Sequence, residues 1–595
     1  MNSNKACCWI LTILVGGFVL TMLLIGWGIS RAMSNGFSAK LASNVAVQEN
    51  SWLVFNISGP IADYNSEPDL GPLGGGRGSS LNDMVRALKL AETDPDVSGV
   101  ILRPRGATGM ASLRELRQAL LSFRETDKPI YAHLDVATDR DYYLASVADT
   151  ILLMPGRLSG INFGGMAYSN TYVKGTFEKL GIKFHVLHAG RYKGAYEDLA
   201  KDSMSTDLRE SLVTLFADLY ETYVRETAEA RTGLTYAALD HELKEGQELI
   251  VSAGTCLKNG YVDRLEDWPV LRKRLQGDAE EFNAVSPSSY VNSKHTVKVE
   301  STQNEIAVLH AQGAIEFGDD EGMFDDENIT VKEFNKQLDA LAEDENVKAV
   351  VVRVTSPGGS ALASKQILEA ARRLNEQKPL IVSMGGVAAS GGYYISLAAD
   401  KIVAQPNTIT GSIGVVSVFP SAEELYKKIG AREETISIGR WANFFRIDEG
   451  LGPDQERVLM SLMDTVYAEF RDDVTAGRGL SAAALDTIAE GRVWTGTQAL
   501  ARGLVDTLGG VDVAIAIAVR EAALGPDDYK ISYYPERDDV FAFFVKHFAS
   551  QLRLIDTAGQ KLEMLNDPAA ILAYVKNFFN RMEFVQTLLP VTLDQ

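Results

Sequence analysis

Cysteine is scarce in this 595-residue chain, and the scarcity excludes two classes of protein. Only Cys7, Cys8 and Cys256 are present. Disulfide-rich scaffolds and Cys-based zinc modules need more cysteines at fixed spacings. We therefore expect neither a disulfide framework nor a metal site, and no motif in the sequence points to a cofactor.

Positive charge is also in short supply. Lys and Arg total 58 against 79 Asp and Glu, which gives a formal net charge of −21. A surface this acidic repels phosphate backbones, so general nucleic-acid binding is not expected. Hydrophobic residues make up 46% and charged residues 23%, values typical of folded proteins. The length leaves room for about three or four domains.

Long apolar runs are rare, with one exception at the N-terminus. Residues 6–29 carry no charged side chain. As a helix they would span about 36 Å, enough to cross a membrane with some tilt. A cleaved signal peptide is the alternative, with a weak cleavage site at residues 32–34. We favour an anchor over residues 1–34, followed by a polar tether over residues 35–50. The apolar stretch 571–582 is too short to span a bilayer.

The chain contains an internal duplication, which organises the rest of the sequence. The matching segments are residues 94–103 with 344–353, 128–130 with 378–380, 142–143 with 393–394, 148–149 with 399–400, and 260–263 with 503–506. The drift in the offset between the copies indicates small insertions in loops. We predict a first repeat over residues 51–274, a connector over 275–304, a second repeat over 305–525 and a C-terminal extension over 526–595.

Each copy shows alternating strand and helix patterns. In the second copy, strands are expected at residues 306–309, 347–354 and 380–383, with helices at 331–341, 363–375, 455–475 and 496–502. Short connections between buried strands and amphipathic helices are typical of an α/β domain with a mostly parallel sheet. The predicted fold class is therefore two tandem α/β repeats behind one N-terminal transmembrane helix.

Two glycine-containing turns follow strands of the second copy. The first is Thr355-Ser-Pro-Gly-Gly-Ser360, and the second is Ala388-Ala-Ser-Gly-Gly-Tyr-Tyr394, which contains Ser390. Turns at the carboxyl ends of parallel strands can present backbone N–H groups to a ligand, and a serine at a helix N-terminus can act as a nucleophile. The alternative is that these glycines only permit tight turns and close packing.

Histidine, the usual base for a serine nucleophile, is missing from residues 311–546. A base for Ser390 must then come from the first copy, another subunit or a different residue type. When the copies are aligned, Asp139 stands opposite Ser390, and Ala442 stands opposite Lys193. One copy thus keeps a serine and the other a lysine, as expected of one site shared by two degenerate halves. A lone lysine in a loop is otherwise most often a solvated surface charge.

With these motifs the sequence resembles the long, duplicated form of the signal peptide peptidase A family, also called protease IV. The motifs that carry the resemblance are residues 356–360, 384–394, 410–414 and 493–498. The resemblance implies a Ser–Lys peptidase with two repeats of the Clp-protease/crotonase fold. It further implies that Ser390 is the nucleophile, Lys193 the general base and Ser412 a hydrogen-bond partner of the lysine. Backbone N–H groups of Gly359 and Gly391 would form the oxyanion hole.

The resemblance also implies a location and partners. It suggests a single-pass protein of the bacterial inner membrane with its body outside the cytoplasm, a homotetramer, and cleaved signal peptides or other unfolded apolar peptides as substrates. One departure is Gly194 after the lysine, where some relatives have serine. Two other functions remain open at this point: an acyl-thioester-processing relative of the crotonases, and a catalytically dead membrane scaffold.

Overall fold

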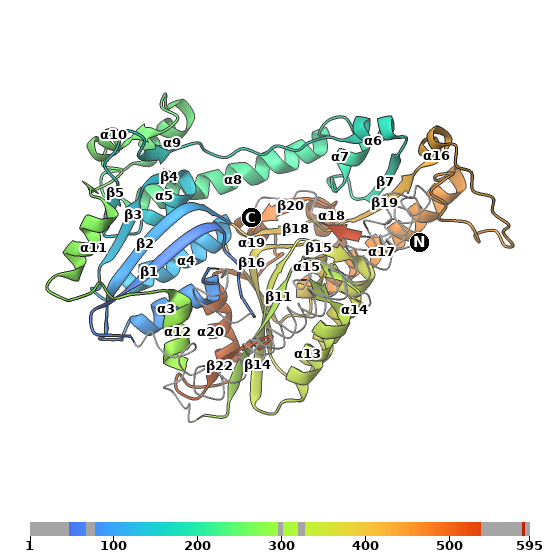
Figure 1. The fold of residues 1–595 in the computed structure, drawn as a ribbon. Coiled ribbons are helices and arrows are strands. Elements are labelled where there is room, and N and C mark those ends of the chain that lie inside the picture. The colour runs from blue at the N-terminus through green and yellow to red at the C-terminus, as the bar shows by residue number, and fades with distance from the viewer. Residues whose placement is uncertain (1–46, 67–77, 296–301, 319–327, 537–585, 589–595) are drawn as a thin grey trace, which may run out of the picture.

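The computed structural model describes residues 47–66, 78–295, 302–318, 328–536 and 586–588. Within these ranges the chain forms two α/β repeats that lie side by side (Figure 1). The predicted anchor at residues 6–29 and the apolar stretch 571–582 lie outside the described residues. Among the helices that are described, none is both long and apolar enough to cross a membrane.

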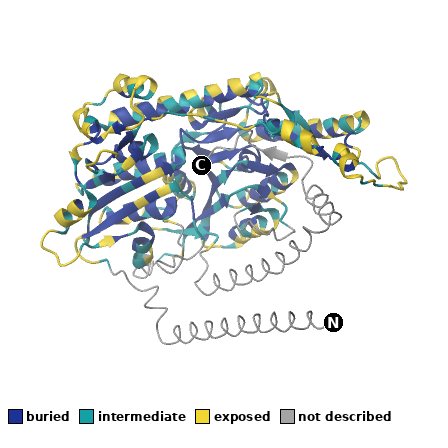
Figure 2. Ribbon diagram, turned by 45° about the horizontal axis from the view of Figure 1, so that its top comes forward, coloured by how far each residue is buried: buried dark blue, intermediate teal, exposed yellow. Residues whose placement is uncertain are grey.

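The first repeat is built on a parallel sheet in the order β10-β1-β2-β3-β5-β9. Its strands are β1 (Ser51–Pro60), β2 (Val97–Thr108), β3 (Ile130–Leu134), β5 (Thr150–Leu153), β9 (Arg264–Leu265) and β10 (Ala284–Val285). The helices used below are α3 (Leu81–Ala91), α4 (Met110–Arg124), α5 (Asp139–Ala145) and α8 (Thr206–Ala230). The strands are largely buried and the outer helices have one exposed face, as Figure 2 shows, which is the pattern expected of a covered parallel sheet.

The second repeat has a corresponding sheet in the order β20-β18-β16-β14-β11-β22, in which β17 also pairs with β16 and β21 pairs with β17. Its strands are β11 (Glu305–Gln312), β14 (Val347–Ser356), β16 (Leu380–Ala389), β17 (Lys401–Ala404), β18 (Ile409–Gly411), β20 (Val493–Thr495), β21 (Thr507–Leu508) and β22 (Lys530–Tyr534). The main helices are α13 (Val331–Glu343), α14 (Ala361–Asn375), α15 (Gly391–Ser396), α17 (Pro453–Arg478) and α20 (Val511–Glu521). All pairs except β18–β20 are parallel.

A third sheet joins the two repeats. Strand β7 (Lys183–Ala189) of the first repeat pairs antiparallel with β19 (Val415–Ser421) of the second over seven residues. The same sheet contains β12 (Ile315–Glu316), β13 (Ile329–Thr330), β15 (Gly358–Ser360) and β23 (Gln586–Leu588). This pairing fixes the loop after β7 against the second repeat.

Helix α8 provides a second connection between the repeats. It runs from the first repeat across the top of the molecule toward β20 (Figure 1). Four leucines on one face, Leu208, Leu212, Leu215 and Leu219, pack against the second repeat. Their partners include Val387 and Ala389 at the end of β16. Because apolar burial stabilises this contact, the end of β16 is held by residues of both repeats.

Three segments differ from the sequence-based expectation. Strand β16 continues to Ala389 rather than ending at residue 383, so no loop separates it from Ser390. The expected connector contributes β10 and α12 (Pro287–His295), and both pack on the first repeat. The C-terminal extension contributes β22, which pairs with β11. The two additional strands form because each segment hydrogen-bonds to an open edge of a sheet. They were not predicted because segments this short carry little periodic signal in the sequence.

Candidate active site

Three predicted residues from distant parts of the chain meet at one point. Ser390 directly follows β16, Ser412 directly follows β18, and Lys193 lies in the loop after β7. The Lys193 Nζ atom lies 2.7 Å from Ser390 Oγ, 2.9 Å from Ser412 Oγ and 3.0 Å from the Ser412 carbonyl oxygen. One chain therefore supplies the serine from the second repeat and the lysine from the first.

Both serines have an unusual backbone. Ser390 has a φ of 56° and Ser412 a φ of 52°, in a region that residues other than glycine seldom occupy. The Ser390 N–H donates to the Gly411 carbonyl at 2.8 Å, and the Ser412 N–H donates to the Arg492 carbonyl at 2.8 Å. These bonds hold the two turns in place. Backbone strain of this kind is concentrated at functional sites, where surrounding structure maintains it.

The lysine side chain is removed from water. Lys193 is 1% exposed, and Ser390 and Ser412 are fully buried. Burial lowers the pKa of the Lys193 amine well below its ordinary value, because the charged form loses its hydration. The groups that hydrogen-bond to it are hydroxyl and carbonyl oxygens rather than carboxylates. The environment therefore favours a neutral amine, which can accept a proton.

The loop that carries Lys193 is docked on a turn that the sequence analysis did not identify. The Tyr192 N–H donates to the Glu490 carbonyl at 2.7 Å, and the Gly491 N–H donates to the Ile413 carbonyl at 2.7 Å. A Cβ at Gly491 would lie 2.6 Å from the Lys193 Cβ. Only glycine permits this close approach, and it places the lysine loop beside the Ser412 turn. Glu490 and Gly491 lie just before the motif at residues 493–498, but that motif did not indicate that they hold the lysine loop.

The two predicted oxyanion residues lie in glycine turns that pack together. Gly391 follows Ser390 in the chain, and Gly359 lies in β15, which contacts α15. A Cβ at Gly392 would lie 2.6 Å from the Ser356 carbonyl oxygen, and one at Gly359 would lie 2.1 Å from the Ile315 carbonyl oxygen. Glycine at position 392 lets the helix that begins after Ser390 pack against the Ser356–Ser360 turn, and glycine at position 359 lets β15 pack against β12.

The corresponding position in the first repeat is closed. Asp139 begins α5, as the alignment of the copies indicated, and Asp141 stands where the second repeat has Gly392. The Asp141 carboxylate accepts hydrogen bonds from the N–H groups of Gly106 and Ala107, both at 2.9 Å. These amides belong to the turn that matches the Pro-Gly-Gly turn. The Asp141 carboxylate thus occupies the backbone N–H donors that an oxyanion would need. The position that matches Ser390 holds Asp139, which has no hydroxyl group.

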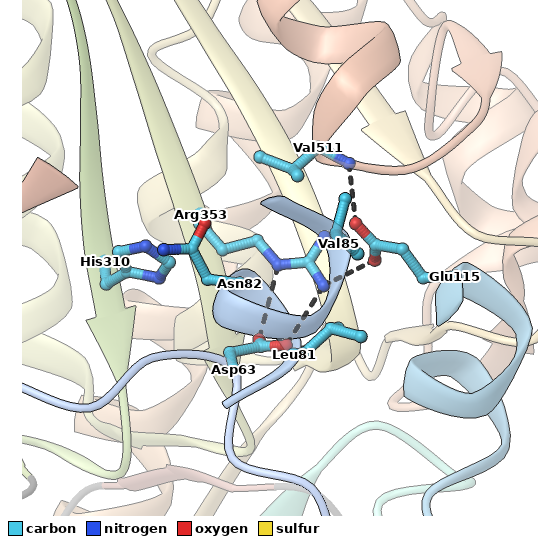
Figure 3. Close-up of a pocket in the computed structure, with 8 residues that line it drawn as sticks. All are labelled: Asp63, Leu81, Asn82, Val85, Glu115, His310, Arg353 and Val511. Atoms are coloured by element: carbon cyan, nitrogen blue, oxygen red, sulfur yellow. Dashed lines mark hydrogen bonds and ion pairs between the residues drawn. The ribbon is translucent and has the colours of Figure 1, made fainter. Parts of the chain in front are cut away.

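A buried charge cluster lies between the two repeats (Figure 3). Arg353 on β14 donates to Asp63 at 3.1 Å and to Glu115 at 2.7 Å, both from the first repeat. Glu115 also accepts the Val511 N–H at 2.8 Å. Burial would raise the pKa of the Asp63 carboxyl, but Arg353 and the Thr355 hydroxyl outweigh burial and lower it. Within the described ranges, no group of three or more His, Cys, Asp or Glu side chains is arranged to hold a metal ion.

Sequence comparisons relate the chain to known peptidases. The profile of peptidase family S49 matches residues 122–280 and 372–525, and the profile of the ClpP-like SDH-type serine proteinases matches residues 292–435. Protease 4 of Salmonella typhi is 32% identical over 599 residues, covering 93% of each chain. Protease 4 of Haemophilus influenzae is 31% identical and covers 85% of each chain. The chloroplastic serine protease SPPA of Arabidopsis thaliana is 31% identical over 80% of this chain and 70% of its own.

The fold and these matches define the protein as an α/β serine-type peptidase related to ClpP. More narrowly, the chain belongs to peptidase family S49, and its two repeats both contain segments that match the family.

Proposed function

We propose that this protein is a serine endopeptidase with a Ser–Lys dyad shared between its two repeats. The observation that carries the proposal is the 2.7 Å contact between the buried Lys193 amine and Ser390 Oγ. A neutral amine has one lone pair and two N–H groups. It can accept the Ser390 proton and donate to the Ser412 hydroxyl and carbonyl, which matches the three contacts.

The reaction follows from these positions. Lys193 takes the Ser390 proton as Oγ attacks the peptide carbonyl, and the oxyanion is stabilised by the N–H groups of Gly359 and Gly391. The protonated lysine then gives its proton to the leaving amine, and an acyl-enzyme remains on Ser390. Lys193 next activates a water molecule, which releases the acid and regenerates the serine. Ser412 keeps the amine oriented throughout.

We further propose that the substrate is an extended peptide. Strand β15, which holds Gly359, pairs antiparallel with a segment of the chain itself, Gln586–Leu588, and this segment also pairs with Val416 of β19. The slot between β15 and β19 therefore fits a backbone in extended conformation. Adding a strand to an exposed edge is a common way to bind peptides irrespective of most side chains. Signal-peptide remnants and other unfolded apolar segments fit this description.

Digestion of a peptide library by the intact protein tests the proposed function. Cleavage sites should cluster beside small or apolar residues, because burying a charged side chain next to the slot costs desolvation energy. Mass spectrometry of the products reads the sites, and Ser390→Ala serves as the control. A variant that ends at residue 585 should digest the library faster, since the slot is then empty. Cleavage that ignores hydrophobicity, or rapid cutting of native globular proteins, would refute this substrate assignment.

The pH dependence of the reaction should report the lysine. Below the depressed pKa of Lys193 the amine is protonated and cannot act as a base, so kcat/KM should rise with pH and then level off. The midpoint should lie well below about 10.4, the value for an unperturbed lysine. Initial rates on a fluorogenic peptide across pH give the profile. A rate that rises only near the unperturbed value would mean that a solvated group is the base.

Membrane attachment and assembly complete the proposal. The apolar segment 6–29 would anchor the protein in the bacterial inner membrane, with the body on the extracytoplasmic side. We propose a homo-oligomer, a tetramer by resemblance. The segment after α16 (Glu423–Ile429) supports association with other copies, because Ile436 and Ile438 are 98% and 95% exposed and large exposed apolar side chains mark contact surfaces.

A further inference from the structure

Strand β16 is bulged just before Ser390. Its pairing with β14 runs from Val354 opposite Met384 to Ser356 opposite Ala388. Two steps along β14 therefore correspond to four along β16, so the three residues 385–387 lie opposite the single residue Thr355. A bulge bends a strand and redirects the residues that follow it, and bulges are common beside active sites. The direction in which Ser390 leaves the sheet depends on this bulge.

A carboxylate of the first repeat contacts the bulge. Asp63 is 6% exposed and accepts a hydrogen bond from the Thr355 hydroxyl, opposite the bulged residues. A Cβ at Gly385 would lie 2.1 Å from Thr355 Oγ1 and 2.6 Å from Asp63 Oδ2. Gly385, the first residue of the bulge, thus packs directly on the Asp63–Thr355 pair. If the Asp63 or the Thr355 side chain moved, the backbone at Gly385 would lose the contact that holds it in place.

The other side of the bulge is held by bonds to its carbonyl groups. Arg353, which is paired with Asp63, donates to the Met384 carbonyl at 3.4 Å, immediately before the bulge. The Thr408 hydroxyl donates to the Gly385 carbonyl at 2.7 Å, and the Thr410 hydroxyl donates to the Ala388 carbonyl at 2.7 Å. The bulge is therefore fixed on both faces, and Asp63 is the part of this arrangement that comes from the first repeat.

The cluster is poorly suited to a purely stabilising role. Arg353 already has a buried ion pair with Glu115 at 2.7 Å. A second buried carboxylate leaves the cluster with excess negative charge, and the desolvation of such groups commonly offsets their attraction. Asp63 instead contacts Thr355 on β14 and packs against Gly385 on β16. These two strands lead to the Ser356–Ser360 turn and to Ser390, so Asp63 can fix the positions of both.

We infer that Asp63 is a positioning residue for the reaction at Ser390. Through Thr355 it fixes the bulge of β16, and the bulge sets Ser390 Oγ at hydrogen-bond distance from Lys193. The first repeat then contributes two residues to the site: Lys193 as the base, and Asp63, which positions the strand that carries the nucleophile. This inference rests on the proposed function, since it assumes that Ser390 is the nucleophile.

Paired substitutions at Thr355 test the inference with little change of shape. Thr355→Val removes the hydroxyl that Asp63 accepts and keeps the side-chain size, whereas Thr355→Ser keeps the hydroxyl. Misplacing a reacting group by about 1 Å can cost about 100-fold in rate, so Thr355→Val and Asp63→Asn should each lower kcat by about tenfold or more. KM should stay within about twofold, because uniform substrate binding is not affected. Thr355→Ser should recover most of the lost turnover.

A control at the same boundary separates positioning from general loosening of the repeats. Glu226 on α8 accepts from Arg114 at 2.8 Å, and Arg114 also donates to Gln405 of the second repeat, but neither side chain is hydrogen-bonded to residues 385–387 in the described part of the chain. Glu226→Gln should keep the wild-type kcat. The rate at which a fluorophosphonate labels Ser390 should fall in Thr355→Val in proportion to kcat.

The outcomes distinguish the two claims. An unlabelled wild-type Ser390 would refute the proposed function itself. A labelled wild type with wild-type kcat in Thr355→Val, or an equal loss in Thr355→Ser, would overturn only the role of Asp63. If Asp63→Asn does not fold, the comparison of Thr355→Val with Thr355→Ser still tests the role of Asp63.

Discussion

Replacing either Ser390 or Lys193 with alanine is expected to lower peptide hydrolysis by about 10⁴-fold or more, because neither residue works without the other. Ser390→Ala removes the nucleophile, and Lys193→Ala removes the only nitrogen base within reach of Ser390 among the described contacts. Members of one catalytic unit are not additive, so the double variant should be no slower than the single ones. Steady-state hydrolysis of a fluorogenic peptide measures all three variants.

Two controls make this result interpretable. The thermal midpoints of the three variants should show that the fold persists, since both replacements introduce smaller, uncharged side chains at buried positions. Arg191→Ala removes a cation two residues before Lys193 whose side chain is 61% exposed, and it should leave the rate almost unchanged. Full activity in Lys193→Ala would contradict a site shared by the two repeats. If the wild-type protein hydrolysed no peptide, the result would favour the alternative function of a catalytically dead membrane scaffold.

Arg353→Met should cause the largest loss of stability. The substitution leaves the Asp63 and Glu115 carboxylates buried without their common cation, where each is no more than 6% exposed. Breaking a buried ion pair from one side typically lowers the free energy of unfolding by about 3–5 kcal/mol. Urea denaturation followed by fluorescence should therefore show a much lower midpoint.

A surface ion pair provides the comparison for this effect. Arg471 pairs with Asp486, whose side chain is 59% exposed. Arg471→Met should change the free energy of unfolding by no more than about 1 kcal/mol, because the side chains of Arg471 and Asp486 are 29% and 59% exposed and water screens their attraction. Equal midpoints for the two variants would show that the cluster between the repeats contributes little to stability.

Much of the fold was predictable because the duplication shows the repeats and the apolar strands show the sheets. Residues 347–354 and 331–341 were expected as a strand and a helix, and they correspond to β14 and α13. Strand β16 was predicted to end at residue 383, whereas it continues to Ala389 and contains Gly385 and Gly386 in a bulge. Without the neighbouring strand, a glycine pair does not show whether a strand ends there or continues through a bulge.

The residues that meet in the candidate site were predictable from the sequence, but the way in which the fold brings them together was not. The loss of a serine in one repeat and of a lysine in the other pointed to Ser390 and Lys193, and the structure brings them together. The antiparallel pairing of β7 with β19 makes the contact possible, and strand pairing over more than 200 residues of sequence leaves no local signal. Asp63 was missed for the same reason, since its partner Thr355 lies 292 positions away.

The most direct test of the shared site is covalent labelling of the intact protein with a fluorophosphonate, with the modified residue mapped by mass spectrometry. The account predicts one adduct, on Ser390, formed much more slowly in Lys193→Ala and absent in Ser390→Ala. An adduct on another serine, or equal labelling rates with and without Lys193, would contradict it.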